Sequence, residues 1–295
     1  MNAESTVARF AGLWGLDEDA QRRQSLAVIE VAYPYNVFVD ESAQNRYGGK
    51  VMAVTAYVGA FDRWLALEYE WRAILERFEV PLDGKPEHTQ PFFHMTDFIA
   101  RQKQFKNAWP DAKRDEFIER LTMTTSEYTI LGVGCCVVEE EFRQLPDDVQ
   151  NEWREPYYFC IWGILSLLLG VETHYPITIP RPLWFLFDRR KKAVQFAASI
   201  FYQVKATKDP TGILGEMGFG EMWKTPQLQA ADLLVYETAR YKLERDYNLS
   251  PSMRKSFEKL KRKNRLLIVY LNREYLDKYV QFVRRAQATE ESADS

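Results

Sequence analysis

Three acidic residues stand where an unpaired carboxylate would be costly. Asp40 ends the apolar run Val37-Phe-Val, and Asp188 ends the run Leu183-Trp-Phe-Leu-Phe. Asp232 lies within Gln229-Ala-Ala-Asp-Leu-Leu-Val-Tyr236, a stretch of helical composition. Because a buried carboxylate must be paired, hydrogen-bonded or bound to a cation, these acids are candidates for one shared site. A set of carboxylate oxygens suits a hard cation such as Mg²⁺ or Mn²⁺.

The apolar runs before Asp40 and Asp188 predict buried β-strands. The turn signal Gly48-Gly49 and the β-rich run that follows it predict that the first strand continues into an antiparallel hairpin. If the strands of Asp40 and Asp188 are neighbours, both acids lie at one end of a central mixed sheet, where open α/β sheets bind ligands. The expected elements, in order, are strands at 37–40 and 51–58, helices within 61–128, a strand at 129–138, a helix at 157–171, a strand at 183–187 and a helix at 228–243.

The composition is that of a folded protein with a substantial core. The chain has 295 residues, of which 46% are hydrophobic and 14% aromatic. We expect an α/β domain over 30–243 with a helical insert at about 61–128. A basic helical extension over 244–286 and a frayed tail over 287–295 are expected to follow.

The net charge of −3 hides an uneven distribution. Between Arg240 and Arg285 the sequence has fourteen Lys and Arg against five Asp and Glu. Such a basic region can follow a phosphate backbone, or it can be the solvated face of helices. The sequence leaves both interpretations open.

Several other classes of protein are disfavoured. Residues 1–15 lack the pattern of a signal peptide, and the longest apolar run is shorter than the roughly 20 residues of a membrane span. Cys135, Cys136 and Cys160 lie in apolar runs and are expected to be buried free thiols, so we expect a cytoplasmic protein without a membrane partner. No phosphate-binding glycine loop, zinc-spaced His/Cys set or GxSxG motif occurs.

Four segments carry a resemblance to a known family. They are Val39-Asp-Glu-Ser42, Phe93-His-Met-Thr-Asp-Phe98, Phe187-Asp188 and Leu228-Gln-Ala-Ala-Asp-Leu-Leu234. From about residue 35 to residue 240 the sequence resembles the family of domain of unknown function 3800 (DUF 3800), which is grouped with the ribonuclease H-like folds. The resemblance implies a ribonuclease H-like mixed central sheet flanked by helices, with a helical insertion and a helical C-terminal extension.

Ribonuclease H-like enzymes cut phosphodiesters with two divalent cations. The resemblance therefore implies that Asp40, Asp188 and Asp232 bind metal, with Mg²⁺ or Mn²⁺ as the expected cofactor. Each acid also has a structural interpretation. Asp40 can close a turn with Ser42, Asp188 can pair with the basic run that follows it, and Asp232 can be held by polar partners in the core.

Side chains around the three acids have candidate roles as well. Glu41 is either a solvent-facing acid or an auxiliary ligand, and His94 is either a proton shuttle or a hydrogen-bonded structural residue. Gln229 shares a helix face with Asp232, where it can orient the acid, meet a substrate or pack on the sheet. The candidate substrate-binding residues are Ser42, Arg189, Arg190, Lys191, Lys192 and Gln229, and Glu221 is a possible fourth acid.

The leading hypothesis is a metal-dependent nuclease that cleaves RNA or DNA by a two-metal mechanism. A catalytically inactive module that keeps the fold and binds nucleic acid or protein is the alternative from another class. It predicts acids without metal affinity. A phosphotransferase acting on a small nucleotide is a further alternative, and it predicts binding that salt does not weaken.

Overall fold

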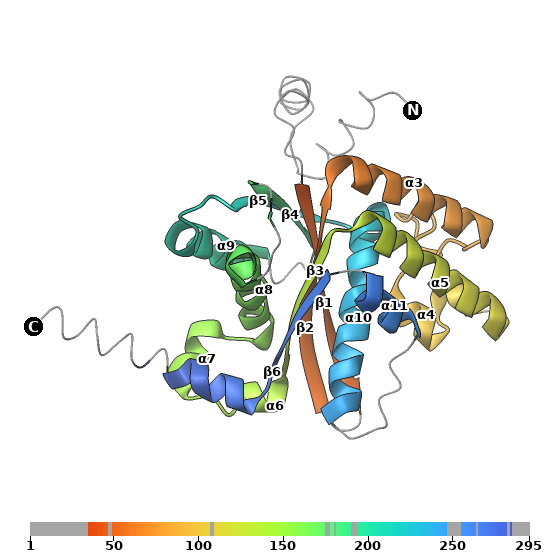
Figure 1. Ribbon diagram of the computed structural model, residues 1–295. Helices are drawn as coiled ribbons and strands as arrows, with labels where there is room; N and C mark the ends of the chain where they lie inside the picture. The colour runs from red at the N-terminus through yellow and green to blue at the C-terminus, as the bar shows by residue number, and fades with distance from the viewer. Residues whose placement is uncertain are drawn as a thin grey trace, which may run out of the picture.

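The chain is described by a computed structural model over residues 35–46, 49–106, 109–174, 178–179, 181–189, 194–246, 255–263, 265–281 and 284. Within these residues, a mixed sheet runs through the centre of the molecule and helices cover both of its faces (Figure 1). The α/β class and the mixed central sheet expected from the sequence are therefore confirmed. The expected tail over 287–295 lies outside the described residues.

The sheet has six strands in the order β5-β4-β1-β2-β3-β6. β1 pairs with β2, and β2 with β3, in antiparallel fashion, whereas β4, β5 and β6 join through parallel ladders. The expected hairpin is β1–β2, and β4 lies beside β1 as predicted. The strands are β1 Tyr35–Arg46, β2 Gly49–Ala60, β3 Leu131–Val138, β4 Leu183–Asp188, β5 Leu214–Gly220 and β6 Arg265–Leu271.

Helices occupy each connection from β2 to β6, and a further helical stretch follows β6. α3 Phe61–Arg77, α4 Met95–Ala100, the 3₁₀ turn η1 Lys103–Phe105 and α5 Asp111–Tyr128 lie between β2 and β3. α6 Glu139–Phe142, α7 Asp147–Trp153 and α8 Pro156–His174 precede β4, and α9 Val194–Lys208 precedes β5. η2 Met222–Lys224, α10 Pro226–Asp246 and α11 Lys255–Lys263 lead to β6, and residues 273–281 are helical.

Each face of the sheet has its own core, because successive strand side chains point to opposite faces. Val37 and Val39 of β1 belong to the core under α8 and α9. Phe38, between them, belongs to the core under α3, α5 and α10. In Figure 1 these two helix groups lie on opposite sides of the sheet.

The insert between β2 and β3 is held together by aromatic side chains. Phe117 of α5 lies at the centre of this cluster, with its ring 5.5 Å from that of Phe98 and 5.8 Å from that of Phe93. Because burial of each ring removes a large apolar area from water, this cluster fixes α4 against α5. Its members are Phe78, Phe93, Phe98, Phe105, Trp109 and Phe117.

The prediction of a helical extension over 244–286 missed one strand. Arg265–Leu271 forms β6, which pairs in parallel with β3 at the edge of the sheet. Its sequence Arg-Leu-Leu-Ile-Val-Tyr-Leu is rich in β-branched and aromatic residues, which favour strands. The basic residues on either side of this short run obscured it.

The structure also bears on the three cysteines and on membrane-spanning helices. Cys135, Cys136 and Cys160 are buried free thiols, as predicted. Among the described helices, none has the length and apolar composition needed to cross a bilayer.

Candidate active site

The parallel ladder between β1 and β4 brings two of the predicted acids together. Its last pair is Val39 with Phe187, so Asp40 and Asp188 are the next residues on adjacent strands. By strand alternation Asp40 lies on the same face as Phe38, which packs in the core under α10. The sequence prediction that these two acids lie on neighbouring strands is therefore confirmed, but Asp40 does not end its strand, because β1 continues to Arg46 in its ladder with β2.

Helix α10 crosses the same face of the sheet and brings the third acid. Thr55, the cross-strand partner of Asp40, donates its hydroxyl to the carbonyl of Ala231 at 3.3 Å. Further along β1, Gln44 donates to the carbonyl of Tyr236 at 2.9 Å. These two bonds fix α10 along β1 and β2, and Asp232 follows Ala231 directly.

Asp232 is almost fully buried and has a partner in the insert. Its Oδ2 accepts a hydrogen bond of 2.5 Å from the backbone N–H of Met95, at the start of α4. Burial raises the pKa of Asp232 to about 6, against the lowering effects of the His94 charge and the Met95 hydrogen bond, and the charge of Asp188 adds to the rise. The site thus combines residues from β1, β4, α10 and the insert.

Asp40 lies in an unfavourable environment for a negative charge. Only 2% of its surface is exposed, and its Oδ2 accepts no hydrogen bond from the described residues. Burial raises the pKa of Asp40 well above its usual range, and the charges of Asp232, Asp188 and Glu41 raise it further. A buried carboxylate surrounded by like charge needs a proton or a cation to neutralise it.

Asp188 is held by the turn that follows β5. Its Oδ1 accepts a hydrogen bond of 3.2 Å from the backbone N–H of Met222 in η2. This bond orients the carboxylate at the exposed end of β4, where the side chain is half-buried.

His94 lies near Asp232 and directly precedes α4. Its Nδ1 is 2.7 Å from Oδ2 of Asp97, which also accepts a 2.8 Å hydrogen bond from Lys103. Burial alone would lower the pKa of His94, but the hydrogen bond to Asp97 and the charge of Asp232 outweigh it and the pKa is raised. Asp97, which the sequence analysis did not single out, therefore orients the imidazole.

The remaining predicted site residues occupy different environments. Glu41 and Ser42 are half-buried on β1, and because β1 continues to Arg46, Glu41 points to the face opposite Asp40. Arg189 is exposed and lies 3.9 Å from Glu221, which also pairs with Lys224. The other basic candidates, Arg190, Lys191 and Lys192, lie outside the described residues.

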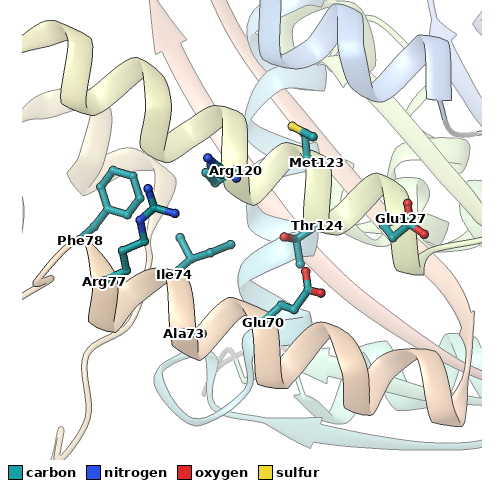
Figure 2. Close-up of a pocket in the computed structure, with 9 residues that line it drawn as sticks. All are labelled: Glu70, Ala73, Ile74, Arg77, Phe78, Arg120, Met123, Thr124 and Glu127. Atoms are coloured by element: carbon teal, nitrogen blue, oxygen red, sulfur yellow. The ribbon is translucent and has the colours of Figure 1, made fainter.

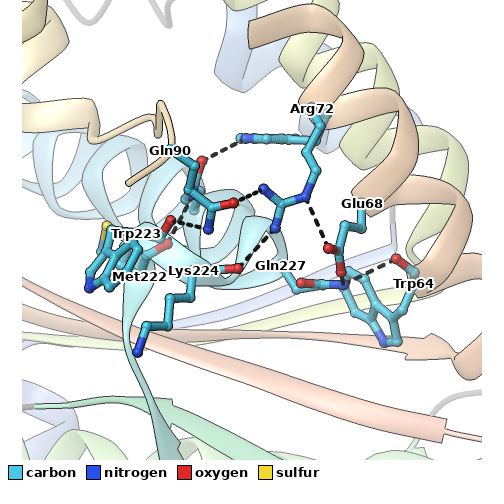
Figure 3. A network of polar contacts seen from close by, with 10 residues as sticks. Trp64, Glu68, Arg72, Gln90, Met222, Trp223, Lys224 and Gln227 are labelled. Carbon is cyan, nitrogen blue, oxygen red and sulfur yellow. Dashed lines mark hydrogen bonds and ion pairs between the residues drawn. The ribbon is translucent and has the colours of Figure 1, made fainter. Parts of the chain in front are cut away.

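A polar network that sequence reasoning missed connects α3 to η2. Arg72 donates to Oε1 of Glu68 at 3.0 Å and to the carbonyl of Lys224 at 3.1 Å, as Figure 3 shows. Gln90 bridges from Arg72 to the carbonyl of Trp223. The network secures η2, the turn whose first amide binds Asp188. Its members are far apart in sequence and share no motif.

A groove on the insert is separate from the acid cluster. It lies between α3 and α5, with a volume of about 360 Å³, and none of the predicted site residues lines it (Figure 2). Figure 2 shows Arg77 and Phe78 at one end and Glu127 at the other. This mixture of charges and small apolar patches indicates no particular ligand chemistry.

The acid cluster has features both for and against a metal site. As the side chains stand, no group of three or more His, Cys, Asp and Glu among the described residues is arranged around a common ion position. The unpartnered, buried Oδ2 of Asp40 nevertheless fits a cation ligand. The chemistry of the donors, all carboxylate oxygens, suits Mg²⁺ or Mn²⁺.

Comparisons with known proteins add no family assignment. No protein-family model matches the chain, and no curated protein matches it.

Proposed function

We propose that this protein is a ribonuclease H-like nuclease that cleaves RNA or DNA with the help of Mg²⁺ or Mn²⁺. Asp40, Asp188 and Asp232 are its proposed metal ligands. The observation that carries the proposal is the state of Asp40, a buried carboxylate with an oxygen that no described group binds and with two further acids close enough to raise its pKa. The resemblance to DUF 3800 supports the same three residues.

The placement of the acids supports a binding role over a purely structural one. A carboxylate that only stabilises a fold is paired with a cationic side chain or saturated with hydrogen bonds. Asp97 fits that description, since His94 and Lys103 contact it and its pKa is lowered, with these hydrogen bonds outweighing burial. Asp40 does not fit it.

The residues have distinct proposed tasks. Asp40, on a central strand, is the proposed shared ligand, and Asp188 and Asp232 are the proposed ligands from β4 and α10. Metal ions bound there would activate a water molecule and stabilise the leaving oxygen. His94, oriented by Asp97 through Nδ1 and with a side chain 31% exposed, is placed to carry a proton at Nε2 between solvent and the acid cluster.

The substrate class rests on cationic side chains at the site and farther along the same face of the sheet. Arg189 is exposed directly after Asp188. Helix α11, which packs on α5 and β6 on the face that also bears α10, carries Lys255, Lys261 and Lys259, the last of them paired with Glu119. Cationic side chains of this kind bind the phosphate backbone and give affinity that falls with salt. RNA and DNA both meet these requirements.

The second candidate is an inactive binding module that keeps this fold. The observation that favours it is that the described acids are not arranged around a common ion position. It predicts nucleic-acid or protein binding that a chelator leaves unchanged.

The test is a cleavage assay on fluorescently labelled single-stranded and double-stranded RNA and DNA with Mn²⁺, Mg²⁺ or chelator. We expect cleavage that requires the metal and that Asp188→Asn abolishes, while thermal unfolding shows that the variant is folded. Mn²⁺ is also expected to raise the melting temperature of the wild type by several degrees, because ligand at 100 times its dissociation constant stabilises by about 2.7 kcal/mol. If the protein shows neither cleavage nor a thermal shift, the nuclease is rejected in favour of the binding module.

A further inference from the structure

The side chain of Gln229 connects the two segments whose backbone amides donate hydrogen bonds to Asp188 and Asp232. Gln229 is 1% exposed and lies on α10, three residues before Asp232 and on the same face of the helix. Its amide makes three hydrogen bonds to residues outside α10. They run to α3, to the segment before α4 and to η2.

The amide oxygen of Gln229 binds the segment before α4, whose Met95 contacts Asp232. Oε1 accepts a hydrogen bond of 2.9 Å from the backbone N–H of Phe93, and another of 2.8 Å from the indole of Trp71. Two residues after Phe93, the N–H of Met95 donates to Asp232. The bond from Phe93 to Gln229 therefore lies two residues before the amide that binds Asp232.

The amide nitrogen of Gln229 binds η2, whose Met222 contacts Asp188. Nε2 donates to the carbonyl of Met222 at 2.9 Å, and the N–H of the same residue donates to Oδ1 of Asp188 at 3.2 Å. Met222 is thus held on one side by Gln229 and on the other by the acid. Two N–H donors face Oε1 and a carbonyl faces Nε2, so one orientation of the amide satisfies all three partners.

We propose that Gln229 is a positioning residue that sets the separation between the carboxylates of Asp188 and Asp232. This inference rests on the proposed function, because the separation matters only if the two acids share bound metal. Gln229 would act through the backbone of Met95 and Met222, without contact with metal or substrate. Groups bonded directly to metal ligands change metal affinity by about 10- to 100-fold when they are removed, and Gln229 holds the backbone that makes such bonds to Asp188 and Asp232.

Gln227 is a matched control on the same helix. It is also a fully buried glutamine, and its Nε2 donates to the carbonyl of Trp64 at 3.2 Å and to Glu68 at 3.3 Å. Figure 3 shows this side chain directed at α3. It has no hydrogen bond to the segments around Met95 and Met222 among those described. Gln227→Met therefore removes a buried amide of the same kind without removing a bond to Phe93 or Met222, and its connection to η2 is only the indirect one through Glu68 and Arg72.

The experiment measures Mn²⁺ binding by titration calorimetry on the wild type, Gln229→Met and Gln227→Met, after the metal has been stripped with chelator. Thermal unfolding without metal reports the general loss of stability, which we expect in both variants. We expect the dissociation constant for Mn²⁺ to rise at least 10-fold in Gln229→Met and less than 2-fold in Gln227→Met. If Gln229→Met does not fold, Gln229→Asn takes its place, since the shorter side chain keeps the amide but cannot span Phe93 and Met222 together.

The outcomes separate this inference from the function on which it rests. If the wild type binds Mn²⁺ and the Gln229 variants bind it as tightly as Gln227→Met does, the positioning role is overturned and the metal site stands. Wild-type protein that binds no Mn²⁺ would overturn both.

Discussion

The backbone N–H of Met95 donates a hydrogen bond of 2.5 Å to Oδ2 of Asp232. Met95 belongs to the insert between β2 and β3, whereas Asp232 belongs to α10, near the end of the domain. The insert therefore contributes directly to the acid cluster. Its aromatic packing matters for the site as well as for the fold.

The first prediction concerns Phe117, the central ring of the insert's aromatic cluster. Phe117→Ala is expected to lower the free energy of unfolding by about 3 to 5 kcal/mol, because it leaves a cavity beside Phe93 and Phe98. Since these rings fix the start of α4, the variant should also bind Mn²⁺ at least several-fold more weakly at a temperature where it is folded. Urea unfolding and calorimetry measure the two effects.

Phe159 offers a control in the core on the other face of the sheet. It is also fully buried, and it packs against Phe142, Trp153 and Trp162 without belonging to the core under α10. Phe159→Ala should destabilise the fold to a similar degree and leave Mn²⁺ affinity unchanged. Equal losses of affinity in both variants would show that the insert has no specific role in the site.

The second prediction is that the acid cluster costs stability when metal is absent. Asp40→Asn keeps the size of the side chain and removes a charge that Asp188 and Asp232 oppose. At pH 8 without metal the variant should be more stable than the wild type by about 1 kcal/mol, as is common for functional sites. It should also lose the thermal shift caused by Mn²⁺.

Asp148→Asn is the surface control for this experiment, since Asp148 is exposed in the first turn of α7. Its stability should change by less than about 0.5 kcal/mol, and its response to Mn²⁺ should match that of the wild type. If Asp40→Asn instead lowers stability without metal, the carboxylate has a structural role and the metal-ligand assignment is wrong.

The third prediction tests how closely β5 approaches β4. A Cβ atom at Gly215 would lie 2.6 Å from the carbonyl oxygen of Leu183, beside an irregularity in the β4–β5 ladder. Backbone cannot move aside as a side chain tip can, so Gly215→Ala should cost about 1 to 3 kcal/mol in urea unfolding. An unchanged midpoint would show that the two strands can separate freely.

The positions of Asp40 and Asp188 were predictable because local patterns carry them. Each acid follows an apolar run that forms a strand, although only Asp188 is the last residue of its strand and β1 continues past Asp40 to Arg46. The α/β class followed from the same runs, together with the helical spacing between them. Asp232 was predictable as a buried polar residue in a helix, but its contact with Met95 was not.

The unpredicted features depend on contacts between segments that are distant in sequence. Gln229 was assigned to substrate binding, orientation of the acid or packing. Only the tertiary structure shows that Phe93 and Met222 meet on its amide. The strand β6 was missed for a different reason, because its apolar run is short and basic residues surround it. The run carries a strand signal in its β-branched and aromatic residues, but periodicity alone does not separate so short an apolar run from a buried helix segment.

The last prediction concerns the pH dependence of stability, and it involves an acid away from the proposed site. Glu237 on α10 is 2% exposed. Burial raises its pKa from the usual 4.5 to about 7, and the charge of Glu244 adds to the rise. The charge of Arg240 and the hydrogen bond from Ser256 act in the opposite direction and lower the pKa. Because the folded state holds this proton more tightly than the unfolded state does, the stability that it contributes is complete below pH 4.5 and is lost as the pH rises through 7. Glu237→Gln should therefore be more stable than the wild type at pH 8, by up to about 3 kcal/mol, and nearly equal to it at pH 5. Urea unfolding at both pH values measures this difference.

The surface variant Glu155→Gln is the control, and its stability should match that of the wild type at both pH values. A gain for Glu237→Gln that is the same at pH 5 and pH 8 would mean that Glu237 does not titrate in the folded protein over this range.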